Sequence, residues 1–449
     1  AKVEGKICYN FLVQQENGEI VNINREENFV GSYQNDSIKE GCEVFGKAML
    51  VDLSTDGSVG DDIRYTSKIK VTLFAVCHDA GIACAVAPDG VFVKEEETSY
   101  MSFAGKFDTT ANIFFDLQKD SKISRVLCVR NYATIKNVIP SDGYFAVSGE
   151  VYSNVVYQTE DGKLRSMFKQ NQFQEEIAGN DITRDSLVEA WVLAGCGNVE
   201  ENADRNVFEV SIPLYIEGLV YNKQAQNCTV DAFSPKCEVK LTTTSFEQTE
   251  FEATRQFDEN VLTTFAVPEG VPPIDKILTT TPNNITIINQ VAKQGEVTFE
   301  GIANINIVFE TADDDDNIAI NSLDVEVPYS ISYASSDIVE DGNIFATASI
   351  GDVNVKAKRG GELEILAEVN INFAQNKNYT NAVTTAITLG EEKPQKDWAL
   401  EIYRAHEGQT LWDVAKELNV PMSTLVEQNG ELSIPLTDGQ KIVAYNQER

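Results

Sequence analysis

The sequence predicts a mainly β protein in which tandem antiparallel β repeat domains are followed by a small βααβ module. Three observations lead to this fold class. Similar segments recur along the chain, apolar and polar residues alternate within them, and the pattern changes to a helical period near the end. With 449 residues, of which 42% are hydrophobic, the chain is long enough to form several hydrophobic cores.

The first part of the repeat occurs three times. Segments that begin at Gly5, Gly149 and Gly301 align without a gap and carry an asparagine at the same place. Later segments of the three copies also fall into matching positions, which is the signature of one structural unit used repeatedly. The shared asparagines, which we expect at equivalent strand positions, are Asn10, Asn154 and Asn306.

A second part of the repeat occurs twice. The segment from Val91 resembles the segment from Glu238, and Phe107-Asp108 in the first matches Phe257-Asp258 in the second. The third copy breaks off near Leu389 without such a counterpart. We therefore expect three β repeat domains, of which the first lacks its leading segment and the last its closing one. Their expected bounds are residues 1–146, 147–298 and 299–389.

Alternation identifies the conformation of the repeats. In Val147–Tyr157 and Glu364–Phe373, apolar and polar residues alternate as they do in half-buried strands. Asn17-Gly18 and Asp161-Gly162 lie between such runs, and these dipeptides favour two-residue hairpin turns. At the matching place in the third copy, Asp313–Asp316 lacks the alternating ligands and the glycine of a calcium loop, so we expect a longer solvated turn and no metal.

The net charge of −34 argues against several kinds of partner. A surface this acidic repels nucleic acid and anionic membrane surfaces. No apolar run approaches the ~18 residues that a membrane span needs, and the first residues lack the apolar core of a signal peptide. We therefore expect neither nucleic-acid binding nor membrane insertion.

Histidine is scarce, with His78 and His406 the only two in the chain. A zinc site or a histidine-based acid–base centre therefore has few residues from which to be built. The many carboxylates could supply a glycosidase pair, but they do not recur at matching repeat positions. We expect no catalytic residues, no metal and no cofactor, and hence a protein that is not an enzyme.

Eight cysteines occur without a C-x-x-C motif. Cys77 and Cys84 in the first copy, and Cys228 and Cys237 in the second, occupy the stretch between the two parts of the repeat. These four residues are candidates for disulfide bonds or other cross-links. Reduced, half-buried thiols are an equally good interpretation.

A hydrophilic linker at residues 390–398 separates the repeats from a module at residues 399–449. Within this module Trp412 either stacks on a ligand or packs in a small core, and the shortage of apolar residues favours the core. The expected elements are a strand at Glu401–Ala405, a helix capped by Thr410 with Asp413, a helix capped by Ser423 and ending at Asn429-Gly430, and a strand at Lys441–Tyr445.

The module carries a specific set of residues, namely Tyr403, Gly408, Thr410-Leu411-Trp412, Ala415, Asn419-Val420-Pro421, Leu425, Asn429, Leu436 and Gly439-Gln440-Lys441. This set resembles LysM domains, which have a βααβ fold and elsewhere bind N-acetylglucosamine-containing glycans such as peptidoglycan. The usual acid of the family's Gly-Asp-Thr is here Gln409. The resemblance implies a groove for a glycan or a protein partner at Gly408, Gln409, Thr410, Asn429, Gly430, Glu431 and Leu432.

The repeats carry the segments Ile274–Leu278, Phe299–Gly301, Phe309 and Phe257-Asp258. With the terminal module, they resemble the SPOCS domains of spore-coat morphogenetic proteins in endospore-forming bacteria. The resemblance implies a non-enzymatic assembly protein of the spore surface, located in the coat, the exosporium or an appendage, on the mother-cell cytosol side of the forespore. Its implied partners are copies of itself in a head-to-tail polymer, or other spore-coat proteins.

A second interpretation is a cell-wall protein. In that case the terminal module would bind peptidoglycan, and the β repeats would serve as a stalk. Retention on purified peptidoglycan would favour this interpretation, whereas capture of a coat protein would favour docking.

Overall fold

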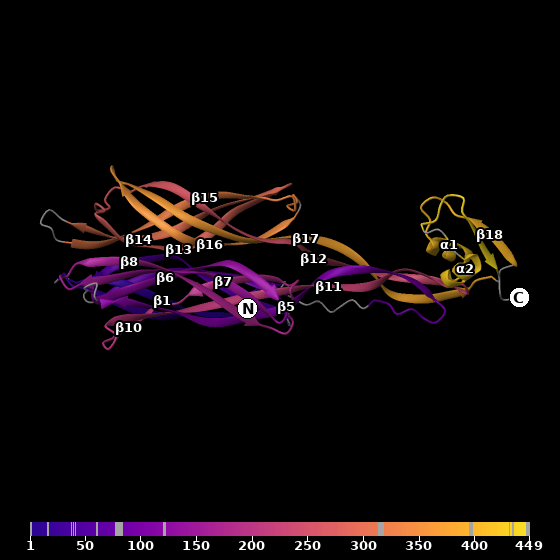
Figure 1. Cartoon of the computed structure of the whole chain (residues 1–449), viewed down its shortest axis with the longest axis horizontal. Helices are drawn as coiled ribbons and strands as arrows, with labels where there is room; N and C mark the ends of the chain where they lie inside the picture. The colour runs from indigo at the N-terminus through magenta and orange to yellow at the C-terminus, as the bar shows by residue number, and fades with distance from the viewer. Residues whose placement is uncertain are drawn as a thin grey trace. The chain divides into compact units, whose positions relative to one another are not determined.

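The computed structural model describes residues 2–445 except 16–17, 37, 39, 41, 60–61, 77–83, 120–122, 313–317, 341, 395–397, 431 and 433–434. The predicted mainly β, antiparallel character is confirmed (Figure 1). The chain forms two compact units, each assembled from separate stretches of sequence. Unit 1 comprises Ala1–His78, Ser102–Asn222 and Phe251–Lys377, and unit 2 comprises Asp79–Met101, Lys223–Glu250 and Asn378–Arg449.

Unit 1 contains a first sandwich, made of two hairpins that face each other. Tyr65 packs against Tyr9 and Phe11, with ring centroids 4.9 and 5.1 Å apart. The hydroxyl of Tyr9 also hydrogen-bonds to that of Ser67 at 2.6 Å. The hairpins are β1 (Lys2–Gln14) with β2 (Ile20–Ser32), and β3 (Glu43–Val59) with β4 (Asp62–Val76).

The second sandwich has more strands in each sheet. Its core includes the fully buried side chains of Phe145, Val147 and Ile212. One sheet contains β6 (Ile123–Ser141), β7 (Tyr144–Thr159) and β8 (Leu164–Ala178), and the other contains β5 (Phe92–Gln118), β9 (Leu187–Ala194), β10 (Asn198–Asn202) and β11 (Val207–Phe233).

The third sandwich has the same plan. Phe299 and Phe373 from its two sheets lie with ring centroids 5.2 Å apart, and both are almost fully buried. One sheet contains β13 (Lys276–Lys293), β14 (Glu296–Ala312) and β15 (Ile318–Ala334), and the other contains β12 (Cys237–Ala266), β16 (Asn343–Lys358) and β17 (Glu362–Glu392).

The predicted domain starts at residues 147 and 299 fall inside β7 and β14. The alternating pattern becomes clear only in these central strands, whereas each sheet already begins with the preceding strand, β6 or β13. Each of these two sheets therefore begins one strand earlier in the sequence than the predicted domain does.

The three asparagines singled out by the repeat all lie on strands, at comparable places in a hairpin. Asn10 is opposite Asn24 in β1–β2, Asn154 is opposite Phe168 in β7–β8, and Asn306 is opposite Asp324 in β14–β15. In the last two hairpins these side chains join neighbouring sandwiches. Asn154 donates to the carbonyl of Thr280 at 2.9 Å, and Asn306 accepts from the guanidinium of Arg130 at 2.7 Å.

The predicted turns differ in length from the two-residue type. Gly162 has the expected positive φ of 80°. However, the amide of Thr159 donates to the carbonyl of Lys163 at 2.9 Å, which leaves three residues in the loop. A type I turn followed by a left-handed glycine has this length. Asn17 and the Asp313–Asp316 turn lie outside the described residues.

A glycine faces an aromatic residue in each of these hairpins. Gly5 pairs with Phe29, Gly149 with Phe173, and Gly301 with Tyr329. A Cβ atom added at Gly149 would lie 2.1 Å from the carbonyl oxygen of Thr134 and 2.8 Å from ring carbons of Phe173. The ring therefore occupies the space that a side chain would need.

Replacing Gly149 by Ala should destabilise unit 1 by about 1–3 kcal/mol, because overpacking forces backbone or ring displacement. The measurement is the urea midpoint followed by circular dichroism. Gly31→Ala is the matched control, since no atom lies within 4 Å of its added Cβ. Equal midpoints for the two variants would contradict the close packing.

Unit 2 ends in four short elements, which follow one another along the chain as β18 (Leu400–Arg404), α1 (Leu411–Leu418), α2 (Met422–Asn429) and β19 (Lys441–Tyr445). The strands β18 and β19 pair in antiparallel orientation. Thr410 caps α1 in a capping box with Asp413. The prediction that Ser423 caps α2 is wrong. The N-cap is Pro421, with φ −54° and ψ 141° and no side-chain hydrogen bond, because the helix begins at Met422 and Ser423 therefore already lies inside its first turn.

Candidate functional site

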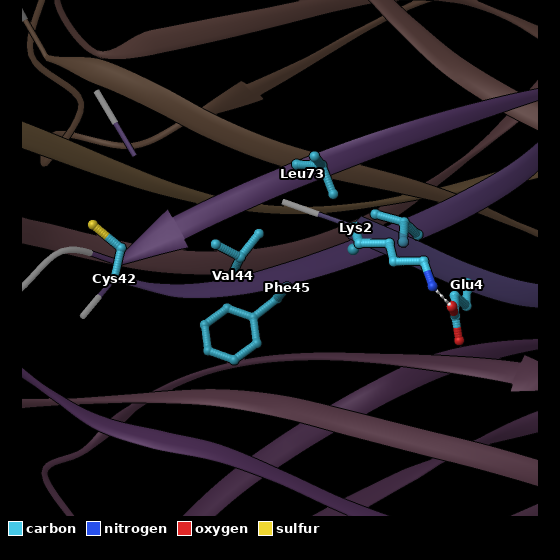
Figure 2. Close-up of a pocket in the computed structure, with 8 residues that line it drawn as sticks. Lys2, Glu4, Cys42, Val44, Phe45 and Leu73 are labelled. Atoms are coloured by element: carbon cyan, nitrogen blue, oxygen red, sulfur yellow. Dashed lines mark ion pairs between the residues drawn. The ribbon is translucent and has the colours of Figure 1, made fainter. Parts of the chain in front are cut away.

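The first sandwich has an open pocket between its two hairpins. Its volume is about 340 Å³. Figure 2 shows Val44, Phe45 and Leu73 around it, with the ion pair of Lys2 and Glu4 beside them. The complete lining is Lys2, Val3, Glu4, Cys42, Val44, Phe45, Gly46 and Leu73. The lining combines apolar side chains with a charged pair, and apolar side chains in such a pocket can contact an apolar group from another segment.

The corresponding faces of the other two sandwiches are covered. Val147 and Phe299, which follow the same repeat alignment as Val3, are both 0% exposed, while Val3 is only half-buried. In the third sandwich the cover includes Phe257 of β12, whose ring lies 6.1 Å from that of Phe299. In the second sandwich Phe107 of β5 packs against the core in the same way.

Strand count explains the difference. Within the described residues, each sheet of the first sandwich has two strands, whereas the sheets of the other two sandwiches have at least three. No described strand takes the place next to β1 that β6 takes beside β7 and β13 takes beside β14. Among the described strands, β1 pairs with β2 alone, and Val3 on the inner face of this sandwich is less completely buried than its equivalents Val147 and Phe299.

Two residues of the predicted glycan groove, Gln409 and Asn429, hold neighbouring segments through side-chain hydrogen bonds. Gln409 donates to the hydroxyl of Tyr403 at 2.9 Å and accepts from the amide of His406, also at 2.9 Å. Asn429 joins α2 to β19, because its side chain bonds both the carbonyl and the amide of Val443 at 2.7 Å. These two amide side chains hold the loops around them in place.

The remaining groove residues divide into two kinds. Gly408, Thr410 and Gly430 are exposed, and both glycines have positive φ. Leu432 packs against the small core, and Glu431 lies outside the described residues. The exposed members are thus mainly backbone, with one hydroxyl that is already used as a helix cap.

Trp412 lies in the core and contacts β11 within unit 2. It is 8% exposed, its ring meets that of Phe233 edge-on at 5.1 Å, and its Nε1 donates to Asp231 at 2.8 Å. Lys416 pairs with the same carboxylate at 2.7 Å. Partial burial opposes ionisation of Asp231, but the hydrogen bonds from Lys416 and Trp412 outweigh it and lower its pKa. Sequence patterns gave no signal for Asp231.

The predicted cysteines are arranged across the two copies. Sγ of Cys84 lies 2.9 Å from Sγ of Cys228, and both are free thiols, as is Cys237. Cys77 lies outside the described residues. Cys42, which was not among the four candidate residues, is disulfide-bonded.

No group of three or more His, Cys, Asp or Glu side chains suited to a metal ion occurs in the part of the chain that the structure describes. Among the same residues, neither helix is long and apolar enough to cross a membrane. In comparisons with known proteins, no family model, no curated protein and no solved structure matches this chain.

Proposed function

We propose that the protein is a non-enzymatic assembly protein of the bacterial spore surface. Its β repeats, of the SPOCS type, would associate with copies of the chain or dock other coat proteins, and its terminal LysM module would serve as an anchor. The observation that supports assembly is in the first sandwich, where half-buried Val3 lines a pocket of about 340 Å³, while Val147 and Phe299 at the equivalent positions of the other sandwiches are 0% exposed.

The occupied sandwiches indicate what this site would bind. An aromatic side chain on an extended strand fills the equivalent space in the third sandwich, where Phe257 meets Phe299, Tyr333 and Phe373. Strand addition supplies backbone hydrogen bonds, and a pocket for one side chain supplies selectivity. A strand that carries an aromatic residue on its inward face is therefore the ligand that best fits the open sandwich.

Net charge sets the conditions for self-association. Each chain carries −34, so chains repel one another over the Debye length, which is ~10 Å at 0.1 M salt and ~3 Å at 1 M. We expect association to strengthen as salt is added. Sedimentation of the purified chain across a salt series measures the extent of association. The variant Val44→Glu places a charge in the pocket. Leu262→Glu, at an exposed position, is the matched control.

The expected result is association at high salt in the wild type and in Leu262→Glu, and its loss in Val44→Glu. A monomer at every salt concentration would eliminate self-association. A peptide of residues 254–266, compared with the same peptide carrying Phe257→Ala, then tests strand docking alone by fluorescence anisotropy. Equal binding of the two peptides would contradict the aromatic contact.

The second candidate is a peptidoglycan-binding wall protein. The exposed Gly408 and Thr410 of the predicted groove favour it. Retention of the chain on purified peptidoglycan, lost on replacing Thr410 by Asn, which removes the hydroxyl but is still a favourable N-cap residue, would support this function over assembly.

A further inference from the structure

Unit 2 brings together two cysteines that come from different copies of the repeat. Cys84 precedes β5, and Cys228 lies in β11, with 144 residues between their positions. Their sulfur atoms are 2.9 Å apart, so a bond length of about 2.0 Å requires only a small approach. We propose that Cys84 and Cys228 form a disulfide bond under oxidising conditions and so cross-link unit 2.

The bond would fasten a segment that already contacts two strands. The amide of Ala85 donates to the carbonyl of Thr384 in β17 at 2.8 Å, and the side chain of Gln226 in β11 contacts Cys84 at 3.5 Å. The segment around Cys84 is hydrogen-bonded to β17, and a Cys84–Cys228 disulfide would join the same segment covalently to β11. Closing so long a loop also restricts the unfolded chain strongly, which favours the folded state.

The two thiols differ in access to an oxidant. Cys228 is 5% exposed, whereas Cys84 is half-exposed. Burial, with a further contribution from Cys84, raises the pKa of Cys228 to about 11, so this thiol stays protonated at neutral pH. Attack should therefore begin at Cys84.

With oxidised glutathione as the oxidant, the thiolate of Cys84 attacks one glutathione sulfur and releases glutathione thiolate, which takes up a proton. Cys228 then loses its proton and attacks the sulfur of Cys84, releasing the second glutathione. Two protein thiols and one oxidised glutathione become one protein disulfide and two reduced glutathiones. Electrons and protons balance without a metal.

Other thiols provide an internal comparison. Cys196 in unit 1 hydrogen-bonds to Cys8. This second pair of thiols can also be oxidised, so peptide mapping must distinguish a Cys8–Cys196 link from a Cys84–Cys228 link. Cys237 is free and half-buried in unit 2. It serves as the matched control, because it belongs to the same set of candidate residues but not to the proposed bond.

The test is non-reducing peptide mapping by mass spectrometry of the folded full chain after treatment with oxidised glutathione. We expect a linked peptide pair containing Cys84 and Cys228, two hydrogens lighter than the reduced peptides. Cys237→Ser should retain this pair, and Cys84→Ser and Cys228→Ser should each lose it. Oxidised wild type should also resist proteolysis in unit 2 better than either serine variant.

Two results would overturn the proposal. One is recovery of Cys84 and Cys228 as separately alkylated peptides after oxidation of the folded chain. The other is a link from Cys84 to any other cysteine. Both readouts concern covalent bonds within one chain, so they are independent of self-association and of the proposed function.

Discussion

Replacing Phe299 by Ala should lower the stability of unit 1 by about 3–5 kcal/mol, the usual cost of removing a buried aromatic ring. Phe299 is 0% exposed and lies at the centre of the third sandwich. Its ring contacts that of Phe373 across the two sheets and that of Phe257 on the covering strand. The loss should appear as a lower urea midpoint by circular dichroism.

The matched control is Phe114→Ala, which removes the same side chain from β5 at a position that is 72% exposed. Surface substitutions of this kind usually change stability by less than about 0.5 kcal/mol. If both variants unfolded at the same urea concentration, Phe299 would not be a core residue, and the covered state of the third sandwich would lose its main support.

Alternation in the sequence was sufficient to predict the β class and the position of the central strands. Val147, Val151 and Val155 share the face of β7 that packs in the core of the second sandwich, although residues 151–156 are buried on both faces. Glu364–Phe373 in β17 alternates because one of its faces packs in the core of the third sandwich. The Gly-to-aromatic pairs could not be predicted, since they depend on register. Gly149 and Phe173 become neighbours only once β7 and β8 pair.

The candidate site was less accessible to sequence reasoning. Val44 and Leu73 follow the same alternating pattern as other strand residues, and only the folded structure shows that they line a pocket. The pairing of Cys84 with Cys228 was also missed, because nearness in sequence had grouped each with a cysteine of its own copy. Folding instead places β11 of the second copy beside the segment of the first.

Replacing Trp412 by Ala should unfold the β18–α1–α2–β19 region while the sandwiches remain folded. The small core has few apolar residues, and loss of a buried aromatic costs about 3–5 kcal/mol. The core cluster that contains Trp412 shares no residue with the cores of the second and third sandwiches. We expect one calorimetric transition to move to lower temperature and the others to stay in place.

Two further variants separate packing from hydrogen bonding. Trp412→Phe keeps most of the ring contact with Phe233 but removes the Nε1 donor to Asp231, so its loss should be smaller, about 1–3 kcal/mol, because the carboxylate retains Lys416. Tyr445→Ala, at a half-exposed position of β19, should leave melting nearly unchanged.

Unchanged melting of Trp412→Ala itself would mean that the ring is not a core residue. If the same variant also lost retention on peptidoglycan, Trp412 would instead act by stacking on a sugar, and the wall-binding function would be favoured over assembly.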